Sequence, residues 1–188
     1  MIVGNDTFAI ESELTEAYER PSLRGLGFFL IRLAGVAYGV RAMHATLLAC
    51  SFDEVAKRVR DRGTHLAPFS EFPDGGAIAT AAWMASYSET YDPSLLAISR
   101  EEITNTLSNN GIVWAPDGDE AFDDGSHVLQ FDFGDQVRII GSRWTGDRQT
   151  KPSDLRDLSL PADNFYETLE RWRALFEKEW ASTPKTRT

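Results

Sequence analysis

Apolar and polar residues alternate near the start of the chain. Phe8 and Ile10 fall on one side of residues 7–13, and Glu11 and Glu13 fall on the other. A period of two predicts a β-strand. Residues 27–33 are rich in aromatic and branched side chains and predict a second strand, and we expect residues 40–49 to continue the same sheet. Because no helix separates these segments, their strands are expected to pair antiparallel.

Two helices are predicted from their first residues. Ser51 with Glu54, and Ser99 with Glu102, have the spacing of a capping box, in which the serine hydroxyl accepts a hydrogen bond from the amide three residues on. Each predicted helix is followed by a glycine suited to the left-handed C-terminal cap: Gly63 and Gly111.

The last helix is predicted from a repeating pattern that starts near Asn164. Large apolar residues recur there every three or four positions, which is the spacing of one helical face: Phe165, Leu169, Trp172, Phe176 and Trp180. We interpret this face as part of the core rather than as a groove for a partner. The alanines of residues 77–87 indicate a further helix.

Residues 112–114, 128–133 and 136–144 predict a second set of strands, with a tight hairpin at Gly134-Asp135. Leu129, Phe131 and Phe133 share one face of the middle strand. The expected fold is therefore α+β, with a mainly antiparallel sheet covered by three or four helices. No linker divides the sequence, so we predict a single domain over residues 1–188, with a frayed tail at 181–188.

Composition narrows the class of protein. A chain of 188 residues that is 42% apolar can form a proper core, and a net charge of -10 disfavours binding to nucleic acid. Cys50 is the single cysteine, which excludes an internal disulfide, and its apolar neighbours indicate a buried, inert thiol. With neither a signal peptide nor an apolar stretch long enough for a membrane helix, we expect a cytoplasmic protein.

Motifs for catalysis and for cofactors are missing from the sequence. It contains no phosphate-binding loop, no nucleophile elbow and no zinc-protease motif. His44, His65 and His127 stand apart from one another and from the cysteine, so we interpret them as structural rather than as metal ligands. The sequence therefore predicts no catalytic residue, no metal and no cofactor.

One loop concentrates negative charge. Five carboxylates lie within residues 117–124, and no Lys or Arg occurs from residue 112 through 136. The loop fails the calcium pattern because Ala121 and Phe122 occupy the fifth and sixth positions counted from Asp117. Carboxylates beside aromatic residues suit attraction to a basic protein. The predicted partner-binding residues are Trp114, Asp117, Asp119, Glu120, Phe122, Asp123, Asp124 and Asp132.

Several short segments together resemble the immunity protein 42 family of bacterial polymorphic toxin systems. They are MIVGNDTFAIE at residues 1–11, YG at 38–39, ATLL at 45–48, FDDGSHVLQFD at 122–132, VRII at 137–140, and the aromatic residues Phe165, Tyr166, Trp172 and Trp180. The resemblance extends from Met1 to about Trp180. It implies a protein that binds and neutralises a cognate toxin domain and that has no catalytic residues of its own.

We therefore expect an immunity protein that acts by steric occlusion, and the acidic loop would suit a toxin with a basic active site, such as a nuclease. Two other functions stay open. One is a small hydrolase that uses the carboxylates of residues 117–124 with His127. The other is an adaptor that binds its own copies through the aromatic C-terminal helix.

Overall fold

The computed structural model describes residues 1–69, 73–114, 120–145 and 151–186. Its larger sheet has the strand order β1-β2-β3-β4, with two short strands added at the sides. Each of the strands β1, β2, β3 and β4 pairs antiparallel with the next, as predicted. The strands of this sheet are β1 (Ile2–Gly4), β2 (Phe8–Tyr18), β3 (Gly25–Leu33), β4 (Val36–Tyr38), β5 (Thr46–Leu47) and β9 (Lys185–Thr186).

A second, three-stranded antiparallel sheet consists of β6 (Ser126–Phe133), β7 (Gln136–Arg143) and β8 (Ser153–Pro161). The helices are α1 (Leu48–Arg60), α2 (Gly75–Tyr87), α3 (Arg100–Asn109) and α4 (Ala162–Ser182), and the short 3-10 turns are η1 (Pro93–Leu95) and η2 (Glu120–Phe122). The predicted α+β class and the hairpin at Gly134, which has φ +59°, are both confirmed.

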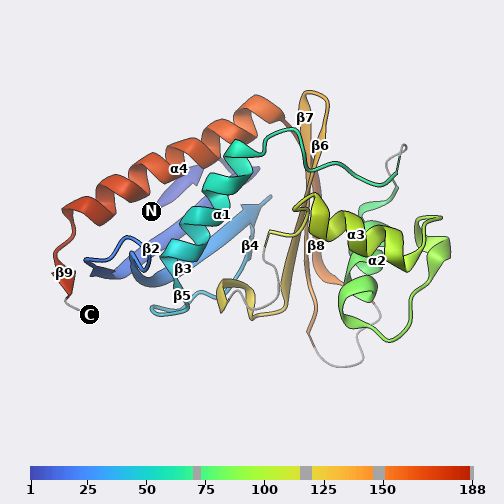
Figure 1. Ribbon diagram of the computed structural model, residues 1–188, viewed down its shortest axis with the longest axis horizontal. Coiled ribbons are helices and arrows are strands. Elements are labelled where there is room, and N and C mark those ends of the chain that lie inside the picture. Colours follow the sequence, from blue (N-terminus) through green and yellow to red (C-terminus); the bar gives the residue numbers. More distant parts are fainter. Residues whose placement is uncertain (70–72, 115–119, 146–150, 187–188) are drawn as a thin grey trace.

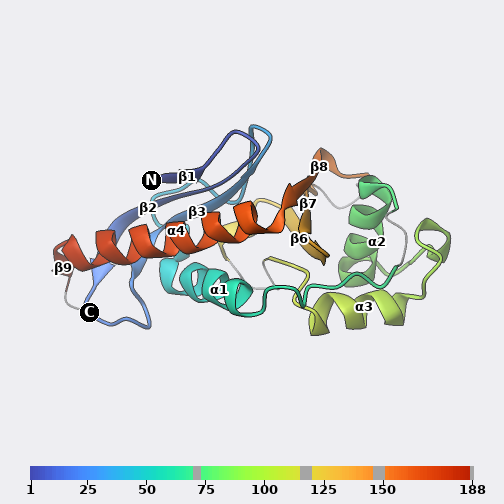
Figure 2. The ribbon, with the colours of Figure 1, turned by 90° about the horizontal axis from the view of Figure 1, so that it is seen from above.

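The smaller sheet stands between two packed layers. Helices α1 and α4 lie over the larger sheet, and α2 and α3 lie on the far side of the smaller sheet (Figures 1 and 2). Side chains along β6 point alternately to the two layers. Val128 packs into the core beneath α1 and α4, while Leu129 and Phe131 pack against α2 and α3. One strand therefore contributes to two cores.

The expectation that residues 40–49 continue the sheet is wrong for most of that segment. Residues 39–45 leave the sheet after β4 and cross its outer face before β5 begins. Arg41 reaches Glu11 of β2 at 2.5 Å, and its guanidinium lies 5.4 Å from the ring centroid of Phe28. Glu11 also pairs with Arg32 at 2.7 Å, so the covered face retains a neutralised carboxylate.

The two predicted capping boxes have different outcomes. Ser99 caps α3 as predicted, since its hydroxyl accepts a hydrogen bond from the amide of Glu102. Helix α1 instead begins at Leu48, which places Ser51 inside the helix. Leu48 is completely buried and lies close to Gly27, where an added Cβ would meet its side chain at 2.8 Å. Burial of this first turn stabilises a helix that begins before the serine, at Leu48.

Helix α4 begins two residues before the predicted start and follows directly from β8. Its aromatic stripe packs into the core, as interpreted from the sequence. The predicted frayed tail takes a different form over its described part: α4 continues to Ser182, and β9 pairs in parallel with the end of β2. No helix in the described ranges is long and apolar enough to cross a membrane.

Tyr38 joins the two sheets. Its hydroxyl donates a hydrogen bond of 3.2 Å to the carbonyl oxygen of Gly141 in β7. A Cβ at residue 141 would meet the tyrosine ring at 2.5 Å, so only glycine permits this close approach. The contact fixes the smaller sheet against β4 of the larger one.

Candidate partner-binding site

The structure separates the predicted partner-binding residues into buried and exposed groups. Trp114 and Phe122 are buried in the core beneath α1 and α4. Asp132 is also buried. Glu120 and Asp123 are exposed, and Asp124 is half-buried. The remaining two predicted residues, Asp117 and Asp119, lie outside the described residues.

We call residues 120–124 the acidic turn. Phe122 anchors it, with its ring centroid 6.4 Å from that of Phe29 in β3. The amide of Val40 donates to the carbonyl oxygen of Ala121 at 2.7 Å. Asp124 accepts a hydrogen bond from the amide of Ser126 and forms an ion pair with Arg143 at 3.1 Å. The turn is thus fixed by its apolar and paired residues, while Glu120 and Asp123 face solvent.

A buried polar network is built around Arg58 of α1 and includes Val113 and Gln130, which lie before and after the acidic turn in the sequence. The guanidinium of Arg58 lies 2.9 Å from the carboxylate of Glu54, donates to Gln130 at 3.0 Å, and donates to the carbonyl oxygen of Val113 at 2.6 Å. Its guanidinium also lies 4.3 Å from the ring centroid of Trp114. Burial lowers the pKa of Arg58 to about 10, and Glu54 offsets part of this effect, so the side chain stays charged at neutral pH.

The same network continues to Asp132 on β6. Tyr166 of α4 donates to this carboxylate at 2.8 Å, His65 Nδ1 pairs with it at 2.9 Å, and the amide of Gly63 donates to it at 2.7 Å. Burial by itself raises the pKa of Asp132, but the hydrogen bonds from His65 and Tyr166 outweigh it and lower the pKa to about 2. Asp132 therefore serves as an internal hydrogen-bond acceptor and is remote from solvent.

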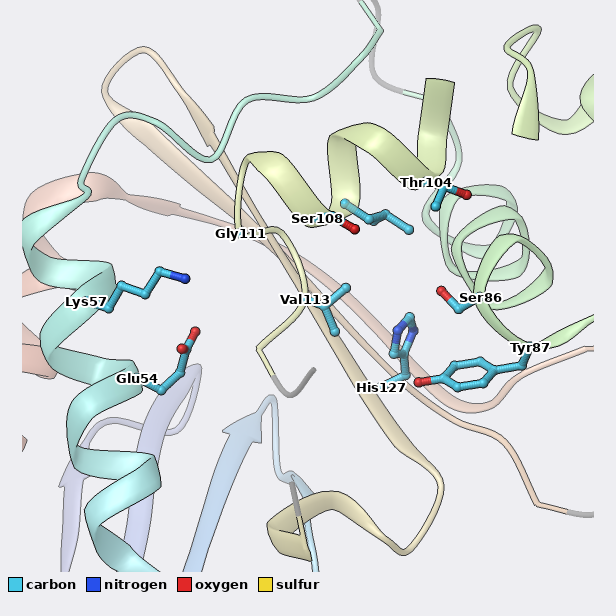
Figure 3. Close-up of a pocket in the computed structure, with 10 residues that line it drawn as sticks. Glu54, Lys57, Ser86, Tyr87, Thr104, Ser108, Gly111, Val113 and His127 are labelled. Atoms are coloured by element: carbon cyan, nitrogen blue, oxygen red, sulfur yellow. The ribbon is translucent and has the colours of Figure 1, made fainter. Parts of the chain in front are cut away.

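A cleft of about 240 Å³ lies in front of this network, between α1 on one side and α2 and α3 on the other. Figure 3 shows Glu54 and Lys57 on the α1 wall, with Thr104 and Ser108 on the α3 wall and Tyr87 at the end of α2. The walls therefore carry one acid, one base and several hydroxyl groups.

The floor of the cleft is formed by Val113 and His127. The ring of His127 lies 6.2 Å from that of Tyr87, in an edge-on arrangement. Because Arg58 binds the carbonyl oxygen of Val113, the buried network holds the floor and the α1 wall in a fixed relation.

Over the described residues, the cleft lacks the carboxylates that the hydrolase alternative requires. That alternative places carboxylates of residues 117–124 beside His127. Among the described residues, Glu54 is the one carboxylate that lines the cleft, and Asp124 is instead paired with Arg143. Over the described part of the chain, no group of three or more His, Cys, Asp or Glu side chains could hold a metal ion.

The adaptor alternative requires an exposed aromatic face on α4. Phe165, Trp172 and Phe176 are each fully buried, and the Trp172 indole donates to Ser12 of β2 at 2.9 Å. Trp180 is half-buried, and its indole donates to the carbonyl oxygen of Arg24 at 2.7 Å. The stripe is therefore occupied inside the chain.

Sequence reasoning missed the residues that hold the site together. Arg58, His65, Gln130 and Tyr166 come from α1, the segment after it, β6 and α4. One signal was present: Arg58 stands three residues after Val55 on the apolar stripe of its helix, where a charge needs a buried partner. Cys50, expected to be buried, is exposed on the first turn of α1, because the helix starts earlier than predicted.

Comparison with family models matches residues 1–174 to the family described as immunity protein 42. The chain belongs to the immunity protein 42 family. This match includes the acidic turn, the buried network and the cleft. The resemblance noted in the sequence is thereby confirmed, and with it an immunity function against a toxin.

The fold of this immunity protein 42 member also has a counterpart among solved structures. The crystal structure of CdiI from Burkholderia dolosa AUO158 is similar with a TM-score of 0.52 and 16% sequence identity. The alignment covers 93% of this chain and 99% of that chain, so the likeness of fold extends over most of both chains. No curated protein matches the chain by sequence.

Proposed function

We propose that this immunity protein neutralises its cognate toxin by covering the toxin's active site, with no chemical change to either protein. The observation that carries the proposal is the family match over residues 1–174, which includes strands β1 to β8 and most of α4. Because the family match covers nearly the whole fold, we expect the toxin to bind to a surface of this fold.

The charge of the molecule supports a partner with a basic surface. The net charge is -10, and Glu120 and Asp123 are exposed on a turn that is anchored from within. Fixed carboxylates attract a basic partner over long range and raise the association rate. By contrast, Asp124 is neutralised by Arg143 and contributes little to this attraction.

The immunity function is tested by co-expression. A toxin domain identified by searching the genes that adjoin the gene for this chain is expressed in bacterial cells with and without the chain. We expect growth arrest in its absence and restored growth in its presence. Arrest that persists despite soluble, folded immunity protein would overturn the proposed function for this pair.

Electrostatic steering is tested with two double charge reversals. Glu120→Lys with Asp123→Lys changes the acidic turn, and Glu167→Lys with Glu170→Lys changes exposed carboxylates on α4. Each reversal alters the charge by two, so both variants carry -6 instead of -10. We expect the first variant to associate with the toxic domain about tenfold more slowly than the second at low salt.

The difference between these variants should disappear as salt screens the attraction. Stopped-flow association rates across a salt series measure both effects. Equal rates for the two variants at low salt would remove the acidic turn from the proposal, while the rescue of growth would still support the immunity function.

A further inference from the structure

We propose that the cleft between α1 and α3 receives the tip of one loop of the cognate toxin domain, which makes it part of the toxin-binding surface. This inference rests on the proposed function. It assigns the cleft walls, rather than the acidic turn, the role of fixing the bound toxin in position.

The size of the cleft favours a protein loop over a small molecule. Its volume of about 240 Å³ is below the roughly 300–1,000 Å³ of most small-molecule sites. Among the described lining residues Glu54 is already paired with the buried Arg58 at 2.9 Å, so the cleft offers the single ammonium group of Lys57 and no cluster of charges that would concentrate a small ion. Hydroxyl groups of Thr104 and Ser108 can both donate and accept, and the hydroxyl of Ser86, which donates to the carbonyl oxygen of Ala82, can still accept. This suits a peptide backbone with its N–H and C=O groups.

An exposed aromatic residue stands at the edge of this cleft. Tyr87 is 52% exposed at the C-terminal end of α2, although its ring is large and mostly apolar. Tyrosine is enriched among the residues that dominate binding energy, especially next to a pocket. Figure 3 shows its side chain beside His127, facing the α1 wall across the cleft. We assign Tyr87 as the aromatic anchor.

The cleft and the acidic turn fit within one interface. Val113 lies on the cleft floor, and Glu120 begins the turn seven residues later. Seven residues of chain span at most about 25 Å. A standard interface buries about 800 Å² on each partner, which corresponds to a patch roughly 30 Å across. A toxin attracted by the turn can therefore contact the cleft at the same time.

The cleft is also held in shape before any partner arrives. Arg58 binds Glu54 on the wall and the carbonyl oxygen of Val113 on the floor, and it is itself almost completely buried. A site that is already formed does not lose free energy to ordering on binding. The buried network thus prepares the cleft for a loop of defined shape.

The test fills the cleft with a large side chain that is introduced by substitution in this protein. Ser108 and Asn109 are neighbouring exposed residues on α3, and of the two only Ser108 lines the cleft. Ser108→Trp therefore blocks the cleft, and Asn109→Trp is the matched control. Thr104→Trp places the same ring on the same wall and guards against a local effect of one position.

The probe is the purified toxin domain from which this chain rescues growth in the co-expression test, with binding measured by surface plasmon resonance. We expect both cleft variants to weaken binding by about 30-fold or more, mainly through faster dissociation, as for hot-spot residues. Asn109→Trp should bind like the wild-type chain. Circular dichroism confirms that every variant is folded.

Each of the following outcomes overturns the cleft proposal, the proposed function or the assignment of the occupant. If the wild type and all three variants bind equally, the cleft is not occupied by the toxin, and the proposed function stands. If the folded wild type itself does not bind, the proposed function fails and the cleft proposal with it. If sedimentation shows that the wild type self-associates and Ser108→Trp does not, the occupant is a second copy of this chain, and the toxin-loop assignment is wrong.

Discussion

Arg58 joins distant parts of the fold through buried polar contacts. It connects a wall helix, a strand and the floor of the cleft through Glu54, Gln130 and Val113. Removing one partner of a buried ion pair leaves an uncompensated charge and unsatisfied acceptors behind. The stability of the folded chain therefore depends on Arg58 more strongly than its position on an amphipathic helix suggests.

We predict that Arg58→Met destabilises the folded chain by about 3–5 kcal/mol, although methionine fills much of the same space. Urea unfolding followed by circular dichroism measures the change. The matched control is Arg60→Met on the same helix, where the side chain is 69% exposed and pairs with its neighbour Asp61. A surface pair of this kind contributes under about 1 kcal/mol. Similar losses for the two variants would contradict the role of the network.

A second prediction at this scale concerns Asp132 and pH. Hydrogen bonds lower the pKa of its carboxyl from 3.8 to about 2 in the folded chain, so the unfolded carboxyl is protonated first as the pH falls. The stabilising effect of Asp132 is therefore complete above about pH 4 and is lost as the pH falls through 2. The shift corresponds to about 2 kcal/mol.

The stability difference between the wild type and Asp132→Asn should accordingly shrink by about 2 kcal/mol from pH 5 to pH 2. Urea unfolding at several pH values between these limits measures it. Asp123→Asn, which removes a carboxylate at an exposed position, is measured as the control. A constant difference for Asp132→Asn would mean that its carboxyl has an ordinary pKa in the folded chain.

At the scale of single elements, the same four-residue capping-box sequence lies at the start of one helix and inside another. Ser99 caps α3, whereas Ser51 is buried within α1, and among the described residues its hydroxyl has no hydrogen-bond partner. We predict that Ser99→Ala costs about 1 kcal/mol, and that Ser51→Ala is neutral or stabilising.

Thermal and urea unfolding of these two variants measures the comparison under identical conditions. Both variants remove one hydroxyl group from a serine that is followed three residues later by glutamate, so the two changes are matched in chemistry and in local sequence. A loss at Ser51 as large as the loss at Ser99 would indicate that α1 begins at the serine after all.

The elements that sequence reasoning found are those whose large apolar residues recur with one period in the sequence. The strand at residues 128–133 and the aromatic stripe of α4 were predicted because each presents regular faces. Strand β8 was missed because Leu155 packs toward α2 and α3 while Leu158 and Leu160 pack into the other core, so its apolar residues follow no simple alternation.

The candidate site was predictable only in part, for a related reason. Glu120 and Asp123 are exposed as a charged loop suggests, since local sequence largely decides such exposure. The burial of Trp114 and Asp132 depends on Arg58 and Tyr166, which come from distant elements. A cleft between α1 and α3 is a property of how those helices are placed by the two sheets, and no local pattern encodes it.

At the scale of the whole molecule, the two cores share a strand and should therefore unfold together. Strand β6 contributes Val128 to one core and Leu129 and Phe131 to the other, and Tyr38 fixes the smaller sheet to the larger one at Gly141. Separate unfolding of the α2 and α3 layer would expose one face of β6 while the other remained packed. Cooperative coupling through a common strand opposes such partial unfolding.

We predict that Phe131→Leu, a change confined to the core beneath α2 and α3, lowers the unfolding free energy of the entire chain by about 1 kcal/mol. Native-state hydrogen exchange measures this separately for slowly exchanging amides in α2 and in α4, which packs on the other core. Equal losses in both helices indicate one cooperative unit, and so a cleft whose walls cannot separate without global unfolding. A loss limited to α2 would show instead that the α3 wall moves independently of α1, in which case the cleft would have to form as the toxin binds.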